Sequence, residues 1–376
     1  MPFGDSTQAG TDHNPGSWKE TRAAMTMVAE VFDVVVGGDT HEDTHTLQML
    51  APTGTKIATV CIDNDETGFA TALEWIRDQA PGARVLIGLE GTRSHGIRLA
   101  RALTRAGLPV VEVERPQRQQ RRGRGKSDPI DAQLAALSVL RMDTDRLPIP
   151  RADGDREALR ILLAGRRELA DTQTRQKNQL TALLRSGSDQ DRLLAQGPYT
   201  AARLHTIARR RGASTDTREQ TVRRAEARRL ATAIQDAHRA LLANHQQLRH
   251  IVNELAPGLI NRPGVGPVSA AQAIVSWSHH RRCRNDAAFA ALAGASPIPA
   301  SSGRVVRHRL NRGGDRQLNR ALHTIATTRW RTCPRTTDYI QRRRAEGKTD
   351  PEIRRTLKRY IARELYKTLN ATATTA

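Results

Sequence analysis

The sequence predicts an α/β domain with a mixed sheet, then a long helical segment and a mainly helical C-terminal part. Three observations predict this arrangement. Strand-like runs joined by short turns come first, strands and helices alternate after them, and two long heptad patterns follow. Aromatic residues make up 3% of the chain, so the cores must consist mainly of Ala, Val, Leu and Ile side chains.

Three strands open the predicted sheet, and the turns between them are short enough for an antiparallel meander. They are expected at residues 31–38, 44–51 and 56–62. The elements expected next are helix 66–79, strand 84–89, helix 94–106, strand 108–113 and helix 129–142. An antiparallel meander followed by βαβ-like units is typical of the ribonuclease-H-like (RuvC-like) fold, a mixed sheet with helices on its faces.

Two heptad patterns predict a helical insertion after this domain. From Leu159 to Leu183 and from Leu230 to Leu255, mostly apolar residues recur in alternating steps of three and four. Asn244 interrupts the second pattern, where it fits either a register-fixing contact between protomers or the interior of a helical hairpin within one chain. We expect an antiparallel coiled coil that separates two domains or pairs two protomers.

The composition along the chain indicates five segments. They are a disordered leader at 1–29, the RuvC-like domain at 30–148, a helical coiled-coil domain at 149–256, a further domain at 257–345 and a basic helical tail at 346–376. Residues 1–114 hold 9 Lys and Arg against 16 Asp and Glu, whereas the rest of the chain holds 51 against 23. This split predicts an acidic N-terminal domain joined to a body that contacts a polyanion, with nucleic acid as the favoured partner.

Several function classes are disfavoured by what the sequence lacks. The cysteines Cys61, Cys283 and Cys333 are too far apart for a disulfide framework or a CxxC zinc site, and they suit a reducing compartment. No apolar run is long enough for a signal peptide or a membrane helix, so we expect a cytoplasmic protein. ATP hydrolysis is not indicated, because the sequence has no GxxxxGK[ST] loop.

Four carboxylates stand where a ribonuclease-H-like core needs them. Asp39 and Glu90 close predicted strands, while Asp128 and Asp131 begin the last helix, three residues apart on one face. Acids at one edge of a sheet can hold two divalent metals, and their oxygens suit Mg²⁺ or Mn²⁺. Helix capping is the alternative, since Asp128 before Pro129 fits an N-cap and Asp131 favours the helix dipole. The order of the four acids in a basic protein favours the metal site.

Basic and glycine-rich segments supply candidate nucleic-acid contacts. A strap at 115–126 has six basic residues and no acidic ones. The turn at Gly264 and Gly266 enters a predicted helix, as in turns that bind a phosphate, although a purely structural turn explains it equally well. The candidate nucleic-acid-binding residues are Arg115, Arg118, Arg121, Arg122, Arg124, Lys126, Gly264, Gly266, Arg304, Arg307, Arg309, Arg312 and Arg316.

Six segments together resemble one known family, the DEDD transposases of the insertion-sequence-110 type. Its three acidic motifs resemble GGDTHEDTH (37–45), LEGTRSHG (89–96) and GRGKSDPIDAQLAA (123–136). Its C-terminal transposase domain is similar to GVGPVSAAQAI (264–274), ALAGASPIPASSG (291–303) and HRLNRGGDRQLNRALH (308–323). The resemblance runs from about Val31 to Trp330 and keeps the family order.

The resemblance implies a role for each motif residue. Asp39, Glu90, Asp128 and Asp131 become a catalytic tetrad that binds Mg²⁺. Either Ser301 or Ser302, with a slight preference for Ser302 beside Gly303, becomes the nucleophile that forms a covalent phosphoserine link to DNA; from spacing alone, a serine-rich turn is the favoured interpretation. The implied partners are donor and target DNA, a structured noncoding guide (bridge) RNA, and further copies of the chain in a dimer or tetramer with composite active sites. A bacterial, nucleoid-associated protein is expected.

Three functions are therefore compared. The first is an RNA-guided DNA recombinase and transposase that cuts and rejoins strands through a phosphoserine, conserving the phosphodiester energy without ATP. The second is a metal-dependent nuclease of the Holliday-junction type that hydrolyses DNA with water and needs the acids but not the serines. The third is a nucleic-acid scaffold with a decayed acidic site, against which the intact tetrad argues.

Overall fold

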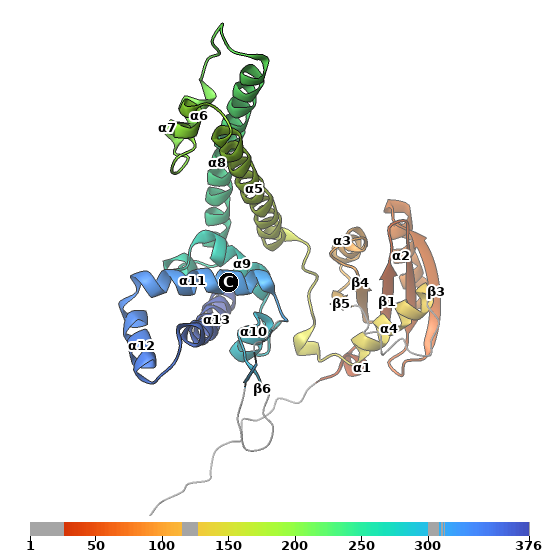
Figure 1. Ribbon diagram of the computed structural model, residues 1–376. Coiled ribbons are helices and arrows are strands. Elements are labelled where there is room, and N and C mark those ends of the chain that lie inside the picture. The colour runs from red at the N-terminus through yellow and green to blue at the C-terminus, as the bar shows by residue number, and fades with distance from the viewer. Residues whose placement is uncertain (1–25, 115–126, 300–307, 310, 312, 376) are drawn as a thin grey trace, which may run out of the picture. The chain divides into compact units, whose positions relative to one another are not determined.

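The computed structural model describes residues 26–114, 127–299, 308–309, 311 and 313–375 (Figure 1). It divides into two compact units, Met1–Pro148 and Ile149–Ala376. The first unit contains a five-stranded sheet, and the second is mainly helical. No helix within the described ranges combines the length and the apolar composition that a membrane span requires.

The first unit has the predicted alternation of strands and helices. Its elements are α1 (Val28–Val31), β1 (Val34–Thr40), β2 (Thr44–Leu50), β3 (Lys56–Asp63), α2 (Glu66–Gln79), β4 (Val85–Glu90), α3 (Ile97–Arg105), β5 (Val110–Val113), α4 (Asp128–Leu140) and the short 3-10 helix η2 (Thr144–Arg146). The strand order is β3-β2-β1-β4-β5, in which β1, β2 and β3 are antiparallel and β1, β4 and β5 are parallel. The prediction of a mixed sheet is confirmed.

Helices cover both faces of this sheet (Figure 1). Val36 and Ile87 pack with residues of α2 and α3 in one core. Val35 and Leu86 point to the other face, because side chains alternate along a strand, and they pack with α1 and α4. The strands between these two layers are almost continuously apolar, as is usual for a sheet buried on both faces.

Two glycines allow α4 to lie unusually close to the sheet. A Cβ atom at Gly37 of β1 would collide with the backbone of Ala132 and Ala136 in α4. A Cβ atom at Gly88 of β4 would collide with the Val139 side chain. At these two positions the strands therefore present only backbone to α4. This close packing sets the distance between α4 and the sheet, and so the position of the first turn of α4 near the end of β1.

Two sequence expectations were wrong in detail. Residues 28–31, expected as the end of the leader and the start of a strand, form helix α1, in which the Phe32 N–H donates to the Val28 carbonyl oxygen at 3.0 Å; Val28 is fully buried in the core under α4. The helix expected from residue 94 begins instead at Ile97. A turn precedes it, because Gly91 has φ +74 and its carbonyl oxygen accepts the Ser94 N–H at 2.9 Å.

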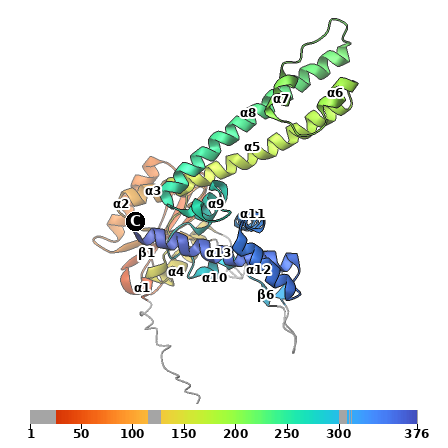
Figure 2. The ribbon, with the colours of Figure 1, turned by 90° about the vertical axis from the view of Figure 1, so that its left-hand side faces the viewer.

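The second unit begins with a long helical hairpin (Figure 2). Its elements are α5 (Gly154–Arg185), α6 (Asp189–Leu194), α7 (Ala201–Ala208) and α8 (Arg218–Leu255). Helices α5 and α8 run antiparallel, since Asn244 Nδ2 donates to the Leu162 carbonyl oxygen at 2.9 Å while Gln173 Nε2 donates to that of Ile234 at 3.3 Å. Asn244 thus lies inside a hairpin of one chain, one of the two placements that its sequence position allows.

The C-terminal segments share one core with the base of this hairpin. They contain η3 (Leu259–Asn261), α9 (Pro267–Trp277), α10 (Asp286–Leu292), β6 (Ile298–Pro299), β7 (His308–Arg309), α11 (Arg316–Thr332), α12 (Pro334–Ala345) and α13 (Asp350–Thr375). Leu159 of α5, Val252 of α8 and Ile361 of α13 belong to the same cluster of buried side chains. The three parts expected at 149–256, 257–345 and 346–376 are therefore packed as one unit, and the basic tail is an integral helix of it.

We expect Gly37→Ala to lower the free energy of unfolding of the first unit by about 1–3 kcal/mol, because the new methyl group must push α4 off the sheet. Gly165→Ala is the matched control. Gly165 lies within α5 with open space around its Cβ position, so the same substitution there should raise stability by about 0.4–1 kcal/mol. Urea unfolding followed by circular dichroism measures both, and equal effects would contradict the close approach.

Candidate functional site

Two of the predicted catalytic acids lie level with each other at the carboxyl end of neighbouring parallel strands. Gly38 of β1 pairs with Leu89 of β4, so the next residues, Asp39 and Glu90, stand side by side in the register. Alternation places both on the face that α4 covers. The Thr40 hydroxyl donates to the Glu90 carbonyl oxygen at 2.7 Å and ties these strand ends together.

The other two acids begin α4, at the same edge. The N-cap is Ser127 and not Asp128, so the capping alternative for Asp128 is wrong. The Asp128 side chain is 51% exposed and lies near the end of β1. Asp131 is buried, one residue before Ala132, whose backbone lies against Gly37. The close contact between α4 and β1 therefore brings Asp131 beside the strand that carries Asp39.

A histidine that the sequence analysis left out of the catalytic set joins this cluster. His41 Nε2 lies 3.2 Å from Asp39 Oδ2 and 3.5 Å from Asp128 Oδ1. One ligand atom from each of these three residues lies within 4.8 Å of the others. Asp39 and His41 are two residues apart, a spacing that puts both side chains on one face of an extended chain, and this spacing is the signal that could have identified His41.

The carboxylates at this edge of the sheet repel one another. Burial raises the pKa of the Asp39 carboxyl above its ordinary value of 3.8, and the nearby carboxylates of Asp131 and Asp128 raise it further, while His41 lowers it. Carboxylates held together at such a cost fit a divalent cation, which removes their repulsion. The set of carboxylate oxygens with one imidazole nitrogen suits Mg²⁺ or, because of the nitrogen, Mn²⁺.

His45, the other histidine near Asp39 in the sequence, has a different place. It is fully buried on the opposite face of the sheet, where its ring stacks on Phe69 with centroids 6.2 Å apart. Arg98 covers the same Phe69 ring at 5.3 Å. Burial lowers the pKa of the His45 imidazole, as expected for a neutral histidine within a core.

Many of the predicted nucleic-acid contacts lie outside the described residues. These are the nucleophile candidates Ser301 and Ser302 and the basic residues Arg115, Arg118, Arg121, Arg122, Arg124, Lys126, Arg304, Arg307 and Arg312. Arg309 lies in β7, which pairs with β6, and Arg316 is exposed at the start of α11.

The two glycines of the Gly-x-Gly turn have different surroundings: Gly264 packs against α11, whereas Gly266 is exposed at the start of α9. Gly264 has φ +71, and a Cβ atom there would press on the side chain of Arg329 and the backbone of Ile325 in α11. Arg329 Nε also donates to the Pro263 carbonyl oxygen at 2.7 Å. Gly266, the N-cap of α9, is exposed with open space at its Cβ position. Packing explains Gly264, and Gly266 alone is placed to meet a ligand.

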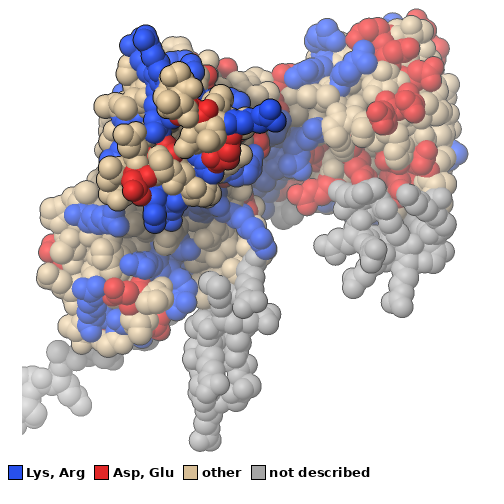
Figure 3. All heavy atoms as spheres, turned by 45° about the horizontal axis from the view of Figure 1, so that its top comes forward, with Lys and Arg blue, Asp and Glu red and all other residues tan. Residues whose placement is uncertain are grey.

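The charge split seen in the sequence also appears on the surface (Figure 3). On the face shown, acidic side chains are prominent over the first unit and basic ones over the second. The metal-binding candidates thus belong to the acidic unit, whereas the excess of arginine belongs mainly to the helical one.

Burial of Asp39 and its repulsion by the neighbouring carboxylates predict how the stability of the metal-free protein depends on pH. Because the Asp39 pKa is raised, its contribution is most favourable below the ordinary aspartate pKa and is lost as pH rises through the raised value. In EDTA at neutral pH, Asp39→Asn should therefore melt at a higher temperature than the wild type, and the difference should shrink in acid.

Asp33→Asn is the control of opposite sign. Hydrogen bonds from Arg84 lower the pKa of Asp33 to about 2, so its contribution is present above the ordinary value of 3.8 and is lost as pH falls toward 2. The Asp33→Asn variant should melt at a lower temperature than the wild type at neutral pH. Differential scanning fluorimetry across pH checks both shifts, and a destabilised Asp39→Asn apoprotein would contradict the charge argument.

Comparisons with known proteins place the sequence among transposases. Residues 36–188 match a family model for transposases of the DEDD, IS110 type, and residues 258–341 match one described as the transposase IS116/IS110/IS902 family. A curated relative, the insertion element IS110 uncharacterized 43.6 kDa protein of Streptomyces coelicolor, is 35% identical over 119 residues. That match spans 31% of this chain and 29% of the relative. Because both family models match in order along the sequence, the chain belongs to the IS110 family of transposases.

Proposed function

We propose that this chain is the transposase of an insertion sequence and that it cuts and rejoins donor and target DNA through a covalent phosphoserine intermediate. The observation that carries the proposal is the meeting of Asp39, Asp128 and His41 at the end of β1 in a chain of the IS110 family. A divalent metal at that position would support phosphoryl transfer on DNA by stabilising the charge that develops on the phosphate oxygens.

The metal would be held by residues of the first unit alone. Asp39 and Asp128 supply oxygens beside the His41 nitrogen, Asp131 adds a buried carboxylate, and Glu90 stands level with Asp39 on the next strand. A bound Mg²⁺ or Mn²⁺ would polarise the phosphodiester and stabilise the charge that develops on its oxygens. The protein fixes the geometry in advance, because α4 cannot move relative to β1 without disrupting the contact at Gly37.

The nucleophile in this proposal is Ser301 or Ser302. Its hydroxyl oxygen bonds to phosphorus, the bond from phosphorus to one DNA oxygen breaks, and that oxygen leaves as a hydroxyl with the proton that the serine gave up. A hydroxyl of the second DNA strand then attacks the phosphoserine and releases the serine. The number of phosphoester bonds is conserved, so no ATP is consumed.

We further propose that a structured guide RNA selects the DNA and that the protein works as a homo-oligomer in the bacterial nucleoid. Support comes from composition, since 53 of the 60 basic residues are arginines and aromatic residues make up 3% of the chain. A protein of this kind contacts backbone and shape well but has few side chains for stacking on bases, so base pairing would supply the sequence information.

Trapping tests the chemistry. The purified protein, labelled donor and target DNA, RNA transcribed from the gene's flanks and Mg²⁺ are incubated, denatured and separated. The wild type should give DNA covalently bound to protein. Asp39→Ala should lower the yield at least about 100-fold by removing a metal ligand, and the double change Ser301→Ala with Ser302→Ala should give none.

The single serine variants then identify the nucleophile. If the double variant still exchanges strands, the serine mechanism is wrong. Free cleaved DNA without any adduct would indicate the hydrolytic nuclease instead, since that chemistry needs the acids and uses water in place of serine.

A spectroscopic measurement tests the donor set separately from activity. Mn²⁺ bound to the protein should show ¹⁴N modulation in electron spin-echo experiments, because the His41 nitrogen lies within reach of the carboxylates. His41→Asn should remove this modulation and lower the affinity for Mn²⁺ more than that for Mg²⁺. His238→Asn, at an exposed position of α8, should change neither. Unchanged modulation in His41→Asn would exclude His41 as a ligand.

A further inference from the structure

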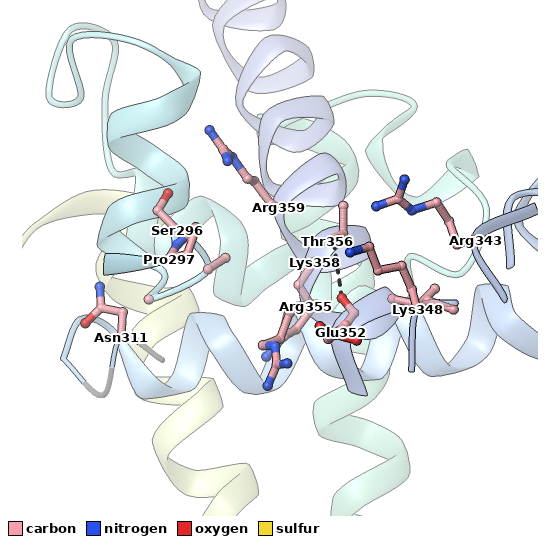
Figure 4. Close-up of a pocket in the computed structure, with 13 residues that line it drawn as sticks. Ser296, Pro297, Asn311, Arg343, Lys348, Glu352, Arg355, Thr356, Lys358 and Arg359 are labelled. Carbon is pink, nitrogen blue, oxygen red and sulfur yellow. Dashed lines mark hydrogen bonds between the residues drawn. The ribbon is translucent and has the colours of Figure 1, made fainter. Parts of the chain in front are cut away.

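A basic cavity of about 520 Å³ lies in the second unit (Figure 4). One wall is the loop at 294–297 together with Asn311, and the other is formed by α13 and the chain leading into it. The charged side chains that line it are Arg343, Lys348, Glu352, Arg355, Lys358 and Arg359. Figure 4 shows Ser296, Pro297 and Asn311 on one side of α13 and Arg343 and Lys348 on the other.

The positive charge of this cavity is largely unneutralised by the described residues. Glu352, its one acid, accepts both the N–H of Thr349 at 2.9 Å and the hydroxyl of Thr349 at 2.7 Å, and so caps the start of α13. Lys348, Arg355 and Arg359 form no ion pair with any described residue. The Nε of Arg359 is buried and has no hydrogen-bond partner in the described ranges.

Basic residues on other sides of α13 are engaged by neighbours. The Arg354 guanidinium lies over the Trp330 ring, 4.9 Å from its centroid. Arg363 Nε donates to Asp286 Oδ2 at 2.8 Å. Arg355 and Arg359, by contrast, line the cavity, where helical spacing brings them onto one face of α13.

The side-chain amide of Asn319 forms hydrogen bonds to both walls of the cavity. Asn319 of α11 donates from Nδ2 to the Ala293 carbonyl oxygen at 2.6 Å, at the start of the loop wall. Its Oδ1 accepts from Lys358 Nζ at 2.9 Å, in the helical wall. The cavity is therefore built before any ligand arrives, which lowers the entropic cost of binding.

The environment of Lys358 supports an anionic ligand. Burial lowers the pKa of its ammonium group, and the charge of Arg355 lowers it further. An anion between the two groups would offset both effects, because it favours the charged form of each.

We propose that this cavity binds a backbone phosphodiester of a nucleic-acid strand, with Arg355 and Arg359 as its principal contacts. Among the described residues that line it, none is aromatic, so the cavity favours phosphate over a stacked base. Arginine forms paired hydrogen bonds to phosphate oxygens. The choice of nucleic acid as the source of the phosphate rests on the proposed function. The helical wall lies beyond residues 258–341, the part that matches the second family model.

Salt-dependent binding tests this site. Fluorescence anisotropy of labelled oligothymidylate and oligouridylate is measured with the full chain in EDTA, over a range of salt concentrations. The double change Arg355→Gln with Arg359→Gln should make the slope of log K against log salt shallower by about 1.4, and Arg355→Gln alone, at an exposed position, by about 0.7. Arg331→Gln with Arg335→Gln, two exposed arginines outside the cavity, should leave the slope unchanged.

The two probes identify the source of the phosphate. A change with the DNA probe alone assigns the cavity to DNA, a change with the RNA probe alone assigns it to RNA, and a change with both assigns it to the shared backbone; each supports the proposal. Unchanged slopes in both cavity variants, an equal change in the control, or no binding of either probe would overturn it. Because EDTA prevents metal-dependent cleavage, loss of the covalent adduct in the trapping experiment would reject the recombinase chemistry without touching this result.

Discussion

The contact of α4 with the bare backbone of β1 and β4 is the constraint on which the candidate metal site depends. Gly37 and Gly88 remove the side chains that would otherwise keep the helix at an ordinary distance from the sheet. The first turn of α4 then reaches the end of β1, so Asp128 and Asp131 of the helix come near Asp39 of the strand. A larger residue at either glycine would act on the chemistry through the position of a whole helix.

The acidic cluster and the basic cavity each gather side chains of like charge, negative in the cluster and positive in the cavity. At the end of β1, like charges are gathered and partly buried, and Asp39 binds its proton more tightly than an exposed aspartate does. At the cavity beside α13, several basic groups are gathered around one described acid, Glu352, which also caps the start of the helix. A ligand of the opposite charge would offset the repulsion in each arrangement.

Much of the first unit follows from its sequence. The strand-like runs, the short turns between them and the order of the elements were sufficient to predict the mixed sheet, and the positions of the four acids indicated a common edge. Helix α1 was missed because four residues carry no periodic pattern. His41 was left out of the catalytic set, since its distance from Asp128 depends on the contact between α4 and the sheet. That contact joins residues nearly a hundred positions apart.

The second unit shows a different limit. The stripe Ile353, Leu357, Ile361 and Leu365 is visible in the sequence at every fourth residue, yet the many arginines around it suggested a separate basic tail. Which core a stripe joins is decided by tertiary packing, and here it joins the one beneath α9 and α11. Local pattern therefore predicted the helix, while its place and its part in the cavity required the structure.

The hairpin of α5 and α8 forms a long arm that projects from the core of the second unit. A helix of 38 residues is about 57 Å long at 1.5 Å per residue, so α8 carries α6 and α7 far from the core in which its base is fixed (Figure 2). Hydrogen bonds from Asn244 and Gln173 to backbone carbonyls of α5 and α8 oppose sliding of one helix along the other. Such an arm turns as a rigid body, and a rotation of about 5° at its base displaces its tip by about 5 Å. Small changes of packing around Val252 and Leu159 are thereby converted into large movements at the far end of the arm.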